Sequence, residues 1–277
     1  MSKLTIILAV AGVMASVAPS LPADLAMAPV PPIAVEIPPA WQFQATLYGW
    51  ATSLSGDVGV GRLPSASVDV GFDDILKHLD GGLMGAFFAR SEDYIVGVDI
   101  VAAKLSSSVN LKVGSGPLAQ FRSGSLVDFE QTMFIGTAFG GIRVPIGGPD
   151  LHLYATAGAR YQYLKAKLTL TRLATGFDRT TEQGQDWVDP VVGFVAKYDI
   201  NDKWFVSALA DIGGFGVSSD LTTQGVVAVG YNWTRSVSTT LGYRALYTDY
   251  ENDNGSGGSF RYKTTMYGPF AGLNLQF

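Results

Sequence analysis

Two histidines and a few acids are the side chains in this sequence that suggest metal or acid–base chemistry. His78 lies in the segment FDDILKHLD, close to Asp73 and Asp74, whereas His152 lies much later in the chain. An acid beside a histidine could activate water for hydrolysis. The sequence contains no cysteine, which excludes disulfides, thiolate metal sites and cysteine nucleophiles.

We favour a structural role, and not a catalytic one, for the segment around His78. The pattern predicts a short amphipathic helix whose Ile75, Leu76 and Leu79 pack into the mouth of a barrel. The strand pattern described below places His78 and His152 at opposite ends of that barrel, where they cannot share a metal or act as a catalytic pair. We therefore predict that the protein is not an enzyme and that it has no metal and no cofactor.

One acidic, glycine-rich stretch is a candidate for Ca²⁺ binding. The sequence DYENDNGSGG at 249–258 supplies oxygen ligands, but it lacks the ordered ligand spacing of an EF-hand loop. We interpret it as a solvated loop.

The charge balance argues against a nucleic-acid partner. The chain carries 19 basic and 24 acidic residues, for a net charge of −5, and nucleic-acid binding calls for a basic surface. Charged residues make up 16% of the chain, below the roughly 25% of average soluble domains, and mean hydropathy is +0.22. Because the only long apolar run lies at the N-terminus, the remaining hydrophobic residues must be distributed along strands.

From Trp41 onward, apolar residues alternate with polar residues or glycine. In 151–164, for example, Leu, Ala and Tyr share one face, and the other face holds Thr, Gly, Arg160 and Gln162. This period of two is typical of strands with one apolar face. Ten strands are predicted near 41–50, 81–90, 94–105, 126–143, 151–168, 186–199, 203–216, 221–233, 237–250 and 261–277.

The connections between these segments alternate in length. Short links fall at 91–93, 145–150, 201–202 and 234–236, and long links fall at 51–80, 106–125, 169–185, 214–220 and 251–260. Membrane barrels have short turns on the periplasmic side and long loops outside. The alternation therefore predicts an all-β fold, a transmembrane antiparallel up-and-down barrel. Ten strands are expected, with eight or twelve as alternatives, and a short helix in the first extracellular loop.

A soluble β-sandwich or a lipocalin-like barrel is the competing interpretation of the alternation. In those folds the apolar face points inward and the polar face meets water, which calls for many Lys and Glu residues. Here the polar face is mostly Gly, Ser, Thr and Gln, which fits a narrow lumen. Aromatic residues at strand ends predict two interfacial girdles. One comprises Trp41, Tyr94, Tyr198, Trp204, Tyr231 and Trp233, and the other comprises Tyr48, Trp50, Tyr161, Tyr163, Trp187, Tyr247 and Tyr250.

The N-terminal region predicts export. Lys3 and the apolar run that follows are typical of a signal peptide, assigned to 1–23 with a cleavage site between 18 and 28. A Pro-rich periplasmic linker follows at 24–40. The barrel then occupies 41–277.

Charged residues within the predicted strands are expected to face the lumen, because a charge facing lipid costs roughly 2–4 kcal/mol at mid-membrane. We expect Arg160 to pair with Asp128 or Glu130 on the preceding strand. The same network could fill the lumen or line a constriction that selects small polar solutes. The predicted set is Asp99, Asp128, Glu130, Arg160, Asp189, Lys197, Asp211 and Arg244.

The last strand, YGPFAGLNLQF, carries an apolar face that ends on an aromatic residue, with Tyr267, Leu273, Leu275 and Phe277 on that face. With the leader and the loop pattern, the chain resembles small Gram-negative outer-membrane β-barrel proteins of the OmpA-like and opacity-type surface-antigen group. The resemblance implies location in the outer membrane. It also implies lipid and lipopolysaccharide as surroundings, and recognition of the last strand by the barrel-assembly machinery and periplasmic chaperones.

Three functions are compatible with this pattern. The first is a structural surface protein or a narrow channel for small polar solutes. The second is a surface adhesion or host-interaction protein acting through its extracellular loops. The third, a barrel enzyme, has no catalytic motif in the sequence to support it.

Overall fold

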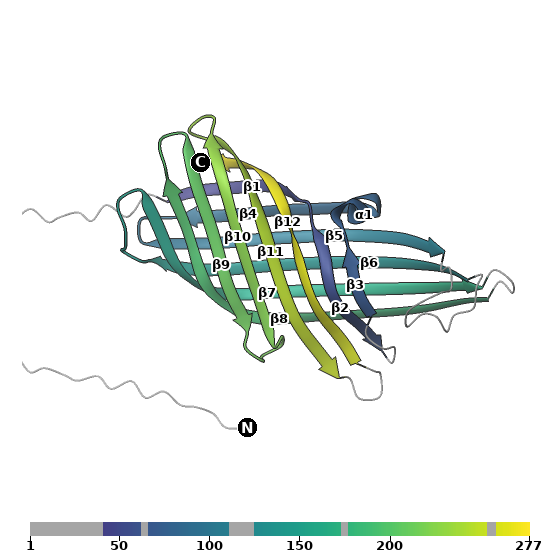
Figure 1. The fold of residues 1–277 in the computed structure, drawn as a ribbon. Coiled ribbons are helices and arrows are strands. Elements are labelled where there is room, and N and C mark those ends of the chain that lie inside the picture. Colours follow the sequence, from purple (N-terminus) through teal and green to yellow (C-terminus); the bar gives the residue numbers. More distant parts are fainter. Residues whose placement is uncertain (1–40, 62–65, 111–124, 173–176, 254–258) are drawn as a thin grey trace, which may run out of the picture. The chain divides into compact units, whose positions relative to one another are not determined.

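A computed structural model of the chain describes residues 41–61, 66–110, 125–172, 177–253 and 259–277. The signal peptide predicted at 1–23 and the linker predicted at 24–40 lie outside these residues, as does the second half, 254–258, of the acidic stretch interpreted as a solvated loop. The first half of that stretch, 249–253, belongs to the strand Val237–Asp253 and not to a loop. Ten long strands make up the wall of a closed barrel (Figure 1). They are β1 (Gln42–Trp50), β4 (Leu79–Arg90), β5 (Tyr94–Asn110), β6 (Ser125–Arg143), β7 (Leu151–Arg172), β8 (Phe177–Asp199), β9 (Trp204–Gly214), β10 (Leu221–Asn232), β11 (Val237–Asp253) and β12 (Ser259–Gln276).

Each of these strands pairs antiparallel with its neighbour in sequence, and β1 pairs with β12 to close the ring. Closure leaves no strand edge with unpaired backbone N–H and C=O groups within the membrane-sized part of the wall. A sheet can span lipid only when these groups are paired. The predicted ten-stranded up-and-down barrel is confirmed. The turns 91–93, 144–150, 200–203 and 233–236 lie together with the C-terminus at one end, which we call the short-turn end (Figure 1). The opposite end is the long-loop end.

Two further strands in the first long connection were not predicted. β2 (Ser53–Gly61) pairs with the first half of the barrel's last strand, Ser259–Tyr267, and β3 (Ala66–Val70) pairs with β2. The chain crosses from β1 to β2 beside Gly268. A Cβ at that position would lie 1.9 Å from the carbonyl oxygen of Ala51, so the crossing requires glycine.

The predicted helix is present as α1 (Phe72–Lys77), but its predicted packing is wrong. None of its residues is buried, and Leu76 and Leu79 are 55% and 37% exposed. The helix lies beside β2, where the backbone N–H of Phe72 donates to Ser53 Oγ at 3.1 Å. Aromatic side chains described below already fill this end of the lumen, so it has no space for the helix.

The outer face of the wall is apolar. Large hydrophobic side chains from many strands around the ring are exposed; among them are Leu47, Leu83, Phe87, Val98, Phe194, Val227, Leu241 and Leu273. A monomeric soluble protein rarely exposes an apolar patch of more than a few hundred Å². The lipocalin-like alternative is therefore wrong for this barrel, because its apolar face is directed outward.

The predicted aromatic girdle at the short-turn end lies on this outer face, with Trp41, Tyr94, Tyr198 and Trp204 exposed. The girdle predicted at the other end is only partly present. Tyr161 is exposed and Tyr163 and Tyr247 are half-buried. Trp50, Trp187 and Tyr250, by contrast, are buried inside the barrel, and Tyr48 points inward with them. The reason is that side chains alternate between the two faces of a strand. Tyr250, for example, lies on the same face of β11 as the buried Arg244.

Candidate functional site

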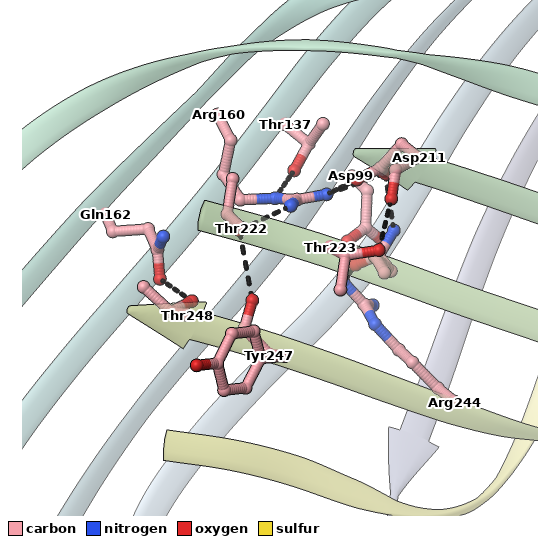
Figure 2. A network of polar contacts seen from close by, with 11 residues as sticks. Asp99, Thr137, Arg160, Gln162, Asp211, Thr222, Thr223, Arg244, Tyr247 and Thr248 are labelled. Atoms are coloured by element: carbon pink, nitrogen blue, oxygen red, sulfur yellow. Dashed lines mark hydrogen bonds and ion pairs between the residues drawn. The ribbon is translucent and has the colours of Figure 1, made fainter. Parts of the chain in front are cut away.

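Arg160, at the middle of β7, is the centre of a buried polar layer that crosses the lumen (Figure 2). Its side chain is fully buried, and its guanidinium donates to Asp211 on β9 through Nη2 at 2.8 and 2.7 Å. Nε donates to Thr137 on β6 at 3.2 Å, and Nη1 donates to Thr222 on β10 at 2.9 Å. These bonds tie four strands together across the interior and compensate most of the desolvation of the charge.

A second arginine completes the layer from the opposite wall. Arg244 on β11 donates through Nη2 to Asp99 at 2.7 Å and to Gln224 at 2.7 Å, and through Nη1 to Tyr48 at 2.6 Å. The Tyr48 hydroxyl in turn donates to Asp99 at 2.7 Å. The guanidinium carbon also lies 4.8 Å from the centre of the Trp50 ring, a distance suited to a cation–π interaction.

The two ion pairs are joined into one unit. Gln224 accepts from Arg244 and donates through Nε2 to Asp211 at 3.4 Å, so one amide bridges the pairs. Two guanidinium groups face two carboxylates, which makes the pair of salt bridges neutral. The layer joins strands that lie on all sides of the lumen, and it has the composition of a structural cross-brace.

Above this layer, toward the long-loop end, the interior is an apolar cluster. Trp187 and Tyr250 stack with ring centres 4.1 Å apart and planes inclined by 12°. Phe260 and Tyr262 contact the tryptophan ring from the side, and all four side chains are buried. Offset stacking and burial of such large rings exclude water from the lumen at this level.

Below the layer, toward the short-turn end, the interior is hollow. A cavity of about 460 Å³ lies there, with Asp99 and Arg244 at its closed end and Gln42, Arg235 and Gln276 near the turns. The barrel interior therefore has three levels: an apolar cluster, a polar layer and a cavity.

Five of the eight predicted lumen charges lie buried or half-buried in the interior near this layer, but not all of them pair as expected. Asp189 is fully buried beside Arg160 in the β7–β8 register, yet it accepts from Ser219 N and Ser219 Oγ at 2.7 Å each. It thereby holds the β9–β10 connection against the wall. Lys197 lies lower, at the cavity, and pairs with Asp199.

The predicted partners of Arg160 were wrong. Arg160 stands opposite Thr137 on β6, whereas Glu130 stands opposite Lys167, further toward the long-loop end. Glu130 pairs with Lys167 at 3.4 Å on the exposed outer face, so its predicted inward orientation is also wrong. The buried residues of β6, such as Thr137, have odd numbers, so the even-numbered Glu130 points outward. An outward charge is tolerated where a strand extends into water. Asp128 belongs to the same end of β6, and its side chain lies outside the described part of the chain.

The uncharged members of the layer were not predicted from the sequence: Tyr48, Thr137, Thr222 and Gln224. The signal that could have found them is the two-residue alternation along each strand, which places each of them on the inward face at the level of an arginine or an acid. The two histidines do lie at opposite ends of the barrel, with His78 at the C-terminus of α1 and His152 beside Asp199. Within the described ranges, no group of three or more His, Asp and Glu side chains could hold a metal ion.

The C-terminal residues form the outward face that the sequence indicated. Leu273, Leu275 and Phe277 are exposed, and Tyr267 is half-buried on the same side of β12. The Phe277 backbone exchanges two hydrogen bonds of 3.0 Å with Phe43, so the last residue belongs to the closing seam of the barrel.

Comparison with known proteins gives only structural likenesses. No family model and no curated protein matches the chain. The outer-membrane protease OmpT of Escherichia coli shares 9% identity over 87% of this chain and 98% of its own, with a TM-score of 0.49. Ail, the attachment invasion locus protein of Yersinia pestis, shares 10% identity over 86% of this chain and 98% of its own, with a TM-score of 0.36. The neisserial surface protein NspA shares 15% identity over 86% and 97%, with a TM-score of 0.31.

The fold is that of an outer-membrane β-barrel protein. This conclusion rests on the closure of the ten strands and on the apolar outer face of the wall. Among the described residues, no helix is long and apolar enough to cross a membrane.

Proposed function

We propose that this protein resides in the outer membrane as a structural surface protein whose lumen is closed. The short-turn end faces the periplasm and the long-loop end faces outward, as in other barrels of this class. The observation that carries the proposal is the burial of side chains that face the lumen. A water-filled channel would leave them accessible, yet Arg160 is 0%, Arg244 3% and Trp187 5% exposed.

Two consecutive levels oppose passage through the barrel. The polar layer is held by charge-assisted hydrogen bonds from opposite walls, and the stacked aromatic cluster lies directly beyond it. A polar solute would have to separate both ion pairs and then cross an apolar level. These two barriers support the structural role over the narrow channel.

The outer half of the wall supports a role at the cell surface. β7 has 22 residues and β8 has 23, whereas about 9–11 tilted residues span the hydrocarbon. On β7 and β8, Lys165 and Glu182 pair at 2.7 Å on the outward face, where lipid would penalise them. About half of each strand therefore stands beyond the membrane, and Figure 1 shows these strands projecting at the long-loop end.

This projection also favours a second candidate, adhesion to a surface or host molecule. β2, β3 and α1 add to the same extension, so the barrel carries a folded platform outside the membrane. Lipid, lipopolysaccharide and the barrel-assembly machinery remain the expected contacts of the wall and of the C-terminal strand. We propose no enzymatic activity.

The closed lumen is tested by conductance across planar lipid bilayers. The wild-type protein should give no single-channel steps after insertion, which is verified by its heat-modifiable migration on gels. A variant that clears one column of the lumen, Asp99→Ala/Arg244→Ala/Trp187→Ala, should conduct. An exterior variant, Glu130→Ala/Lys167→Ala, should stay silent. Reproducible conductance steps from the wild-type protein would overturn the closed-lumen proposal.

Binding tests the second candidate separately. Exchange of the β2–β3–α1 segment, 53–78, for a short turn should abolish binding to host cells if adhesion is the function. Binding retained by that exchanged barrel would count against adhesion through the 53–78 segment, and absence of binding by the wild-type barrel would exclude adhesion and leave the structural role intact.

A further inference from the structure

The cavity at the short-turn end has the size and walls of a ligand site. Its volume of about 460 Å³ falls within the roughly 300–1,000 Å³ typical of pockets for small molecules. The cavity lies wholly on one side of the closed polar layer. It is therefore a blind pocket, and its opening lies among the short turns.

Aromatic and aliphatic side chains form the middle of the pocket wall. Phe88, Phe139, Phe205, Phe270, Leu209 and Val226 surround it from different strands. At the closed end, Asp99 and Arg244 neutralise each other at 2.7 Å and have further partners in the layer. The polar side chains of Thr46, Ser207 and Asn274 also line the pocket. Between the closed end and the opening the wall is nevertheless mainly apolar, and the two charges at the closed end neutralise each other.

The opening of the pocket is basic. Arg90, Lys197 and Arg235 line it, so with Arg244 the lining carries four basic side chains against one acidic side chain, Asp99. Lys197 is neutralised by Asp199 just outside the lining. Arg90 donates to the Gln42 side-chain oxygen at 3.0 Å, which leaves its charge uncompensated.

Arg235 is the second uncompensated cation. It lies in the exposed turn 233–236, and among the described residues it has no ion pair. Because the charges of the closed end cancel, the positive excess is concentrated at the opening, at Arg90 and Arg235.

We propose that this pocket binds a monoanionic amphiphile with a single apolar chain, of the medium-chain carboxylate class. The chain would lie among Phe88, Phe139 and Phe205, and the carboxylate would lie at the opening near Arg90 and Arg235. Apolar depth and a basic rim are complementary to this ligand and to neither a neutral polar solute nor a cation. The proposal goes beyond the surface role, and it rests on the proposed closed lumen only for the blind end of the pocket.

The test is calorimetric titration of the full barrel in nanodiscs of zwitterionic phospholipid, with the heat from empty nanodiscs subtracted. Octanoate should bind saturably with one site per barrel. Hexanoate should bind more weakly by about fourfold for each methylene removed, the factor expected from burial of that group. Octan-1-ol and octylammonium should bind more weakly than octanoate. No saturable octanoate heat, or equal affinity for octylammonium, would overturn the proposal.

Two variants separate the rim from the wall. Arg90→Gln/Arg235→Gln should weaken octanoate about fivefold, as expected for loss of two solvent-exposed charges, while affinity for octan-1-ol stays the same. Ser207→Trp places a large ring in the pocket and should abolish binding of both probes.

Lys203→Gln is the matched control, because it removes an exposed cation from the same end of the barrel without altering the lining. It should bind octanoate as the wild-type protein does. Heat-modifiable migration shows that each variant is folded. Wild-type affinity in a folded Ser207→Trp protein would place the binding elsewhere and refute the pocket. Conductance stays at its wild-type level in all these variants, so this result is independent of the closed-lumen test.

Discussion

Replacing Arg160 by methionine tests whether the polar layer stabilises the barrel as an ion pair. The variant Arg160→Met keeps a long side chain but leaves the Asp211 carboxylate, 8% exposed, without the Arg160 Nη2 group that both its oxygens contact. Breaking a buried pair in this way typically costs about 3–5 kcal/mol, because an uncompensated charge remains. That is a large fraction of the roughly 5–15 kcal/mol that stabilises a folded domain.

The double variant Arg160→Met/Asp211→Leu removes both charges and should recover most of the loss. Buried pairs replaced by apolar side chains are often neutral in stability, since their own desolvation offsets the attraction. Thr137 and Thr222 lose the Arg160 donor in both variants, so the difference between the variants reports the unpaired carboxylate.

The assay is urea unfolding in lipid vesicles, followed by tryptophan fluorescence. The control is Lys165→Met, which breaks the Lys165–Glu182 pair on the outer face of the same strand. Both side chains there are about two-fifths exposed, so the cost should be within about 1 kcal/mol. A loss for Arg160→Met no larger than that of Lys165→Met would refute the view that the layer is a dry, paired brace.

Three further results are expected. The purified protein should show heat-modifiable gel migration and a β-dominated far-UV spectrum; a helix-rich spectrum without detergent would contradict the barrel. Deletion of Phe277 should lower outer-membrane levels more than it lowers the stability of folded protein, and equal levels for truncated and intact chains would exclude an assembly role. Gly158→Ala should destabilise the barrel by about 1–3 kcal/mol, because its Cβ would lie 2.0 Å from the Ala138 carbonyl oxygen. Gly184→Ala, whose Cβ would lie 3.8 Å from Lys165, should change urea unfolding by less than about 0.5 kcal/mol.

The two-residue alternation of apolar residues and the lengths of the connections between strands were sufficient to predict the barrel wall. In strands with one lipid-facing side, every second residue must be apolar, and this signal survives over ten or more residues. The strand centred on Arg160 was predicted with its inward face correct. β2 and β3 gave no comparable signal, because their pairing depends on β12, some two hundred residues away, and on a crossing at Gly268.

The interior was predicted less well than the wall, for two physical reasons. Charge was taken as a sign of inward orientation, but Glu130 lies where β6 extends beyond the membrane and an outward charge costs little. Register was the other missing quantity. Arg160 reaches across the lumen to Asp211 on a strand that is not its neighbour in the wall, and a single sequence carries no information on which strands face each other across the centre.

The position of the sealed layer has a consequence for access to the barrel interior. In the orientation proposed above, the hollow lies on the periplasmic side of the seal, so its contents exchange with the periplasm and not with the medium. A molecule added outside the cell would reach this pocket only after crossing the outer membrane by another route. Any ligand of the proposed pocket would therefore be a compound that is already inside the envelope, whereas the outer surface of the barrel faces a separate chemical environment.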